Sequence, residues 1–140
     1  MKFELDANIY ERIKSLSQEG DEFQHAKNYE KAINKYNEAF LLIPEPKTSW
    51  AASTWVLTAI GETFFFMKKY QEAKQSLIKA LGCPGGKENP FIHLRLGQTY
   101  FELNKVKEAK RELNKARALD TFNSLFKGED NKYYDLIKKQ

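Results

Sequence analysis

The residues able to do chemistry in this chain are few. His25 and His93 are the two histidines among 140 residues, and Cys83 is the one cysteine. A lone cysteine supplies neither a disulfide framework nor a CxxC pair for metal or redox work. The histidines lie far apart in the sequence, and no GxSxG, HExxH or Walker loop accompanies them. We therefore expect no enzyme activity, no metal site and no cofactor.

The composition is that of a globular protein in a reducing compartment. Apolar residues make up 41% of the chain, well above the level of a disordered protein. The first ten residues, MKFELDANIY, carry acids where a signal peptide needs an apolar core. No apolar stretch approaches the roughly 18 residues of a membrane span. These observations predict a cytoplasmic protein without a membrane partner.

Charge is distributed unevenly along the chain. Residues 1–46 hold nine acids against six Lys or Arg, whereas residues 90–140 hold seven acids against eleven bases. Six of these bases crowd one helical stretch: Lys105, Lys107, Lys110, Arg111, Lys115 and Arg117. Because Glu102, Glu108 and Glu112 interleave with them at spacings that allow ion pairs within a helix, nucleic-acid binding is the weakest alternative.

One spacing recurs three times and defines the elements that must position these side chains. A glycine is followed by alanine after twelve residues, a large residue after sixteen and a second alanine after nineteen. The three sets are Gly20, Ala32, Tyr36, Ala39; Gly61, Ala73, Leu77, Ala80; and Gly97, Ala109, Leu113, Ala116. A fixed internal register indicates stacked helix pairs, and small residues let two helices cross closely. We expect the large residue to fill the gap between layers.

The pattern resembles the tetratricopeptide repeat family, whose helix A reads W-x2-L-G-x2-Y and whose helix B reads A-x3-F before a closing proline. The match covers about residues 13–123, and Pro44 closes the first unit. The third unit departs most, because His93 replaces the tryptophan and no proline follows. The resemblance implies an all-α, right-handed α-solenoid of three helix-turn-helix repeats in one domain spanning 1–140.

The expected repeats are about 13–46, 54–87 and 90–123. Gly20 and Gly61 are 41 residues apart, which is seven more than the family's period. Because helix formers follow Ser49, a possible N-cap, we expect the insertion to lengthen the second helix A by nearly two turns. Trp50 would lie on that extension.

In this family the concave groove, lined by the helices A, captures peptides or proteins. Carrying the groove positions onto this chain gives Asp21, Gln24 and His25; Trp55, Thr58, Glu62, Phe65 and Phe66; and Phe91, Leu94, Arg95, Gln98, Phe101 and Glu102. The predicted groove is aromatic with an acidic rim. Some family members hold a carboxylate in a Lys, Asn and Arg clamp. Here Asp21 and Glu62 would repel an anionic terminus, so a clamp is not expected.

The last twenty residues predict a capping helix at about 130–139. Tyr133, Tyr134, Leu136 and Ile137 form an apolar stripe able to cover the open face of the last repeat. The string from Phe126 to Tyr133 also resembles the tail of small bacterial tetratricopeptide proteins that act as immunity partners of secreted toxins.

Two binding hypotheses follow, and both make the partner a protein. In the first, the chain is a bacterial immunity protein that neutralises a cognate toxin by covering its folded toxin domain. In the second, it is a general adaptor or secretion chaperone that holds an extended peptide. The oligomeric state stays open.

Overall fold

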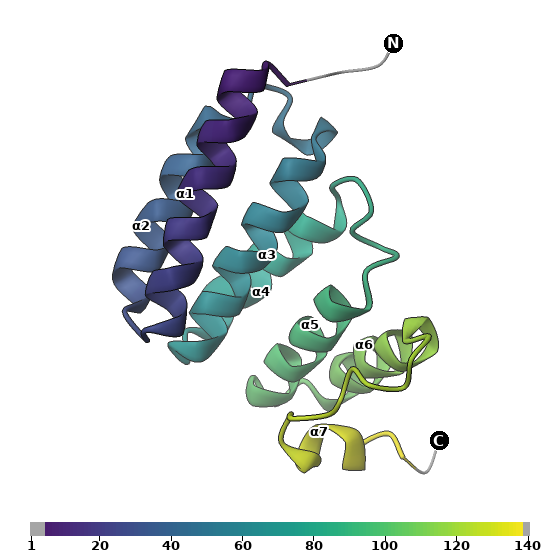
Figure 1. Ribbon diagram of the computed structural model, residues 1–140. Coiled ribbons are helices and arrows are strands. Elements are labelled where there is room, and N and C mark those ends of the chain that lie inside the picture. Colours follow the sequence, from purple (N-terminus) through teal and green to yellow (C-terminus); the bar gives the residue numbers. More distant parts are fainter. Residues whose placement is uncertain (1–4, 139–140) are drawn as a thin grey trace.

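The computed structural model describes residues 5–138, a range that contains helices and no strand. Three helix pairs follow one another: α1 (Ala7–His25) with α2 (Tyr29–Leu42), α3 (Ala51–Phe66) with α4 (Tyr70–Leu81), and α5 (Pro90–Glu102) with α6 (Val106–Leu119). A short helix, α7 (Asn131–Asp135), comes last. The pairs stack in chain order, each contacting its neighbour (Figure 1). The predicted solenoid of three helix pairs with a C-terminal cap is confirmed.

The recurring glycines allow the two helices of each pair to touch. In every pair the glycine faces the large residue of the second helix: Gly20 faces Tyr36, Gly61 faces Leu77 and Gly97 faces Leu113. An added Cβ would lie 2.5–2.7 Å from the nearest side-chain carbon, closer than a real Cβ contact. The large residue thus fills the space left by its own pair's glycine.

The three turns within the pairs share one backbone conformation. Lys27, Lys68 and Asn104 each have a positive φ, of 61°, 61° and 63°. In each turn this left-handed residue ends the first helix, and the second helix begins two residues later. The same left-handed turn therefore joins the two helices in all three pairs.

The start of α3 differs from the sequence prediction. Residues Lys47–Ser49 form a 3₁₀ turn, α3 begins at Ala51, and Trp50 occupies its N-cap position instead of a helical extension. The Trp50 indole donates a hydrogen bond of 2.9 Å to the carbonyl of Pro44 and is buried. Ten residues of α3 precede Gly61, against seven of α5 before Gly97, so α3 gains about one turn. The other inserted residues carry the chain around the end of α2.

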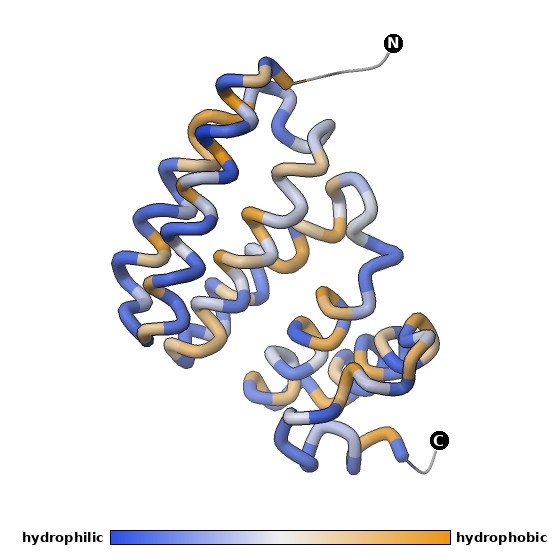
Figure 2. Tube along the Cα trace, viewed as in Figure 1, coloured by the Kyte–Doolittle hydropathy of each residue, from blue (hydrophilic) through white to orange (hydrophobic). Residues whose placement is uncertain are grey.

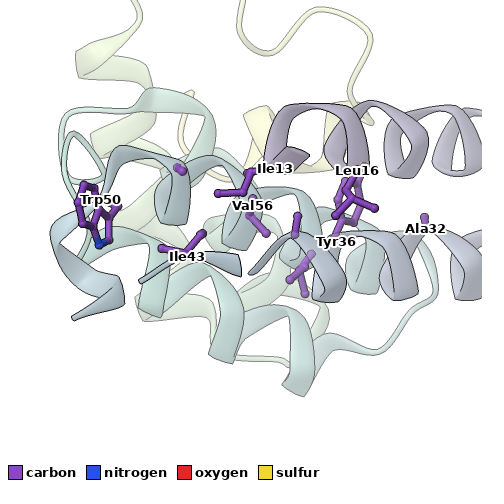
Figure 3. Packing of buried hydrophobic residues seen from close by; sticks show 10 residues of the cluster. Ile13, Leu16, Ala32, Tyr36, Ile43, Trp50 and Val56 are labelled. Carbon is purple, nitrogen blue, oxygen red and sulfur yellow. The ribbon is translucent and has the colours of Figure 1, made fainter. Parts of the chain in front are cut away.

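Buried side chains form clusters between successive pairs. Ile13 and Leu16 of α1, Tyr36 of α2 and Val56 of α3 belong to one cluster, as Figure 3 shows. Hydrophobic residues recur at helical spacing along the chain in Figure 2, with hydrophilic residues between them. The central helix α3 is buried around most of its circumference, because it packs between α1 and α5 as well as on α4.

The C-terminal segment covers the last repeat. Asp130 caps α7 by accepting a 3.0 Å hydrogen bond from the amide of Lys132. Tyr133 and Ile137 are buried in one cluster with Leu94 of α5 and Leu113 of α6. The predicted cap is therefore present; its α-helical part ends at Asp135, and position 139 lies outside the described residues.

Candidate interaction groove

An open hollow lies around Trp55, and we call it the Trp55 hollow. Its walls come from α1, α3 and the loop between α4 and α5, and they include Tyr10, Thr58, Glu62, Pro84 and Asn89. The part between α3 and the loop has a volume of about 380 Å³. Two consecutive helices A and a loop thus build one concave surface.

Two aromatic rings form the exposed apolar part of the hollow. Trp55 is 37% exposed and Tyr10 is 39% exposed. Their rings meet edge to face with centroids 6.3 Å apart, a favoured aromatic geometry. The ammonium of Lys14 lies 5.7 Å from the Tyr10 ring centre. Such rings anchor interfaces because they bury large areas at small entropic cost.

Beyond the hollow, Arg95 binds two carboxylates from different parts of the chain. Its Nε and Nη2 lie 3.1 and 3.0 Å from Oε2 of Glu62 on α3. Its Nη1 donates to Oε1 of Glu129 at 2.8 Å and to Gln98 at 2.7 Å. Arg95 is 6% exposed, so these bonds replace the water that its charge gives up.

Three phenyl rings surround the same guanidinium. The Cζ of Arg95 lies 4.9, 5.4 and 5.6 Å from the ring centres of Phe91, Phe66 and Phe65. These distances fall within the cation–π range. Phe65 and Phe91 are half-buried, while Phe66 is 39% exposed and also contacts Tyr29. The predicted aromatic groove residues are therefore partly engaged by the protein's own arginine.

The remaining predicted residues of α5 lie beneath the C-terminal segment. Leu94 and Gln98 are fully buried, and Gln98 donates to Glu129. Phe101 packs on the Tyr133 ring with centroids 5.4 Å apart, and Glu102 accepts from the Tyr133 hydroxyl and pairs with Lys132. Leu94 and Gln98 are therefore closed to a partner, whereas Phe101 and Glu102 are partly exposed but already contact the C-terminal segment.

The predicted residues of α1 fulfil mixed roles. Gln24 donates to Thr63 of α3 at 2.8 Å, which ties the two helices together. Asp21 accepts from the Tyr36 hydroxyl, and His25 is exposed at the end of α1. Burial, reinforced by the bond to Asp21, raises the pKa of Tyr36, so the phenol remains a donor. Asp21 is thus exposed on α1 and also binds the Tyr36 hydroxyl.

His93, which stands at the tryptophan position of the repeat, belongs to a buried polar cluster away from the groove. Its Nδ1 lies 2.7 Å from Glu112 and its Nε2 lies 2.8 Å from the carbonyl of Lys87. Arg111 donates to the same carboxylate. Burial alone would raise the pKa of Glu112, but the bonds from His93 and Arg111 outweigh it and hold that pKa below its ordinary value.

The other reactive side chains have packing roles. Cys83 lies buried within the α4–α5 loop that walls the Trp55 hollow. Its thiol lies 3.4 Å from the Lys79 carbonyl, and burial raises its pKa. Across residues 5–138, no three His, Cys, Asp or Glu side chains come together in a possible metal site. No helix in that range is both long and apolar enough to cross a bilayer.

Sequence reasoning missed two residues that shape this surface. Tyr10 lies on the first two turns of α1, which starts at Ala7 instead of near residue 13. Asp6 caps that helix by accepting from the amides of Asn8 and Ile9, and an acid before the spacing Ile9, Ile13, Leu16 was an available signal. Glu129 had no local signal, because its partner Arg95 is 34 residues away.

Comparisons with known proteins agree with this architecture. The sequence model of the tetratricopeptide repeat matches residues 56–82 and 92–121. No curated protein sequence matches the chain.

Three solved structures illustrate the similarity of fold. The first tetratricopeptide domain of Spaghetti (RPAP3), bound to the HSP90 peptide SRMEEVD, is 19% identical with a TM-score of 0.74, over 96% of this chain and 97% of that one. The Arabidopsis OM64 domain is 22% identical with a TM-score of 0.72, over 94% and 95%. The Yersinia enterocolitica type III secretion chaperone SycD, in complex with a peptide of the translocator YopD, is 14% identical with a TM-score of 0.72, over 91% and 90%. The chain thus matches the tetratricopeptide repeat by sequence in its second and third helix pairs, and it shares the fold of these solved structures over most of its length.

Proposed function

We propose that this protein is a non-catalytic interaction module that holds an extended segment of a partner protein in the Trp55 hollow. The observation that carries the proposal is the pair of exposed rings, Trp55 and Tyr10, on a concave surface between two helices A. Large exposed aromatics in a hollow are the side chains that contribute most to binding.

The solved structures of similar fold support an extended ligand. The RPAP3 domain holds a seven-residue HSP90 peptide, and SycD holds a peptide of YopD. Both cases favour the hypothesis, drawn from the sequence, that the chain is an adaptor or secretion chaperone. An adaptor of this kind acts by occupancy and requires no reactive group.

The immunity-protein hypothesis is the second candidate. It rests on the string from Phe126 to Tyr133, whose residues have packing roles here: Glu129 binds Arg95, Asp130 caps α7 and Tyr133 is buried. Because these packing roles already account for the string, it gives little support to a toxin partner. The hollow gives more support to a peptide partner. We therefore rank capture of an extended segment first.

The test combines capture with peptide mapping. Wild-type protein, Trp55→Ala and the control Ile78→Ala, an exposed apolar residue of α4, are used as baits in lysate of the native host. Overlapping peptides of each captured protein are then titrated by fluorescence anisotropy. We expect one peptide to bind wild type and Ile78→Ala alike, and Trp55→Ala at least tenfold more weakly.

Two outcomes would overturn the proposal. Peptides that bind all three proteins equally would place the site outside the hollow. A partner that binds as a folded domain, while none of its peptides binds, would favour the immunity function instead.

A further inference from the structure

The Trp55 hollow is charged at one end. Among the described residues that line it, Glu62 is the one whose side chain is charged at neutral pH. Both bonds from Arg95 end on Oε2 of Glu62, and no hydrogen bond within residues 5–138 ends on Oε1. The hollow therefore presents one carboxylate oxygen ready to accept from a ligand.

The positive charge of Arg95 does not neutralise the negative charge around Glu62. Arg95 contributes one positive charge, and Glu62 and Glu129 contribute two negative charges, which leaves a net charge of −1 (1 − 2) on the cluster. Because Arg95 is buried and holds both carboxylates, it is not available to an incoming anion. A ligand carboxylate would meet repulsion here, and a cation would meet attraction.

The opposite end of the hollow favours an apolar side chain. Tyr10 and Trp55 present their rings there, and Pro84 of the α4–α5 loop closes the wall. The ammonium of Lys14 lies over the Tyr10 ring at this end. The hollow thus runs from an aromatic end, next to a lysine, to an acidic end at Glu62.

The protein already binds one cation by this chemistry. Arg95 places its guanidinium among three aromatic rings and against Glu62. Trp55 lies on the same helix as Glu62, seven residues and about two turns earlier. Rings and a carboxylate on one helix face suit a guanidinium or ammonium better than any other peptide group.

We propose that the hollow selects partner segments that carry an arginine or lysine near an apolar residue, with the cation on Glu62 and the apolar side chain between Trp55 and Tyr10. This inference rests on the proposed function and specifies the partner's chemistry. It separates the chain from two structures of similar fold, the first and second RPAP3 domains, which are bound to the acidic peptides SRMEEVD and SGPTIEEVD. A shared fold would then serve opposite ligand charges.

The test is selection from random seven-residue peptides displayed on phage. Wild-type protein, Trp55→Ala and Glu62→Gln are the targets, and Glu72→Gln on α4, an exposed carboxylate away from the hollow, is the matched control. We expect peptides enriched on wild type to contain at least twice as many Lys and Arg as Asp and Glu. Their binding should weaken about tenfold in Glu62→Gln and less than twofold in Glu72→Gln.

A further variant distinguishes a direct bond between the ligand and Glu62 from the general electrostatic effect of the negatively charged cluster. Glu129→Gln removes the other carboxylate on Arg95, and Glu129 does not line the hollow. Binding of the selected peptides should weaken about twofold in that variant. Equal losses in Glu62→Gln and Glu129→Gln would overturn a direct bond at Glu62.

The outcomes distinguish this inference from the proposed function. Enriched peptides that depend on Trp55 but are acidic, or that bind Glu62→Gln as well as wild type, overturn the inference and leave the function standing. A selection that yields no Trp55-dependent peptide overturns both. Circular dichroism of each variant excludes loss of fold as the cause.

Discussion

The groove has an open half and a closed half, although both use the same repeat positions. On α3, Trp55 is exposed beside Tyr10, whereas its counterpart Phe91 on α5 lies half-buried against Arg95. Leu94 and Gln98 further along α5 are covered by residues that follow α6. The repeat pattern sets which face a residue occupies, and the neighbouring elements decide whether that face remains open.

The largest expected effect comes from Arg95, which links the two halves. Arg95→Ala leaves Glu62 and Glu129 without their cation and removes the group between three rings. We expect a loss of about 4 kcal/mol in the free energy of unfolding, measured by urea denaturation. Arg12→Ala, exposed on α1, is the control and should change stability by less than about 0.5 kcal/mol. A loss below about 1 kcal/mol would show that packing alone closes the second half.

The second prediction addresses the buried carboxylate of the third repeat. Glu112→Gln should lower the free energy of unfolding by about 3 kcal/mol at pH 7, because His93 and Arg111 lose a charged partner. The pKa of Glu112 is lowered in the folded state, so its contribution is present above the ordinary value of 4.5 and disappears as pH falls through the folded pKa.

Urea denaturation from pH 7 to pH 3 checks this sign. The difference between wild type and Glu112→Gln should shrink below pH 4.5. If it stays constant with pH, ionisation of Glu112 does not contribute to the stability of the closed half.

The third prediction tests whether helix pairing differs between the halves. Gly61→Ala and Gly97→Ala each place a Cβ 2.7 Å from a leucine carbon, so each should cost about 2 kcal/mol of stability by overpacking. Gly82→Ala, whose Cβ would find its nearest neighbour at 3.5 Å, serves as the control in thermal and urea unfolding. Clearly unequal losses for the first two would mean that the halves also differ in their core.

The smallest effects distinguish two aromatic residues at opposite ends of α3. Phe65 contacts Arg95 and Tyr70, so Phe65→Ala should cost about 1–2 kcal/mol of stability. Trp55→Ala should cost less, about 0.5–1 kcal/mol, because that ring is 37% exposed and its aromatic contact is with Tyr10. Circular dichroism with urea titration measures both. Equal costs would contradict the distinction between a ring that packs on Arg95 and one that is exposed in the hollow.

The sequence predicted the fold because the glycine register is a local, repeated steric requirement. Each glycine must face one large residue sixteen positions later, and this spacing is readable without coordinates. The cap was predictable for the same reason, since the stripe that includes Tyr133 and Ile137 has helical period.

The candidate site was predictable in its positions and not in its exposure. Positions on helix A identified Trp55 and Glu62, which do line the hollow. Which side chain covers another depends on contacts between distant segments, such as Glu129 with Arg95. The prediction that Trp50 lies on a helical extension was wrong. Its indole donates a hydrogen bond to the Pro44 carbonyl at the start of α3, and a helical sequence pattern does not reveal such a bond.

The single thiol gives this protein a built-in reporter of motion. Cys83 is 5% exposed and lies within the α4–α5 loop, next to Pro84 in the wall of the Trp55 hollow. A reagent such as a maleimide reacts with it when that loop swings away, so the labelling rate measures how often the wall opens. A ligand that fastens the loop would slow the reaction, and no engineered cysteine or dye would be needed to observe it.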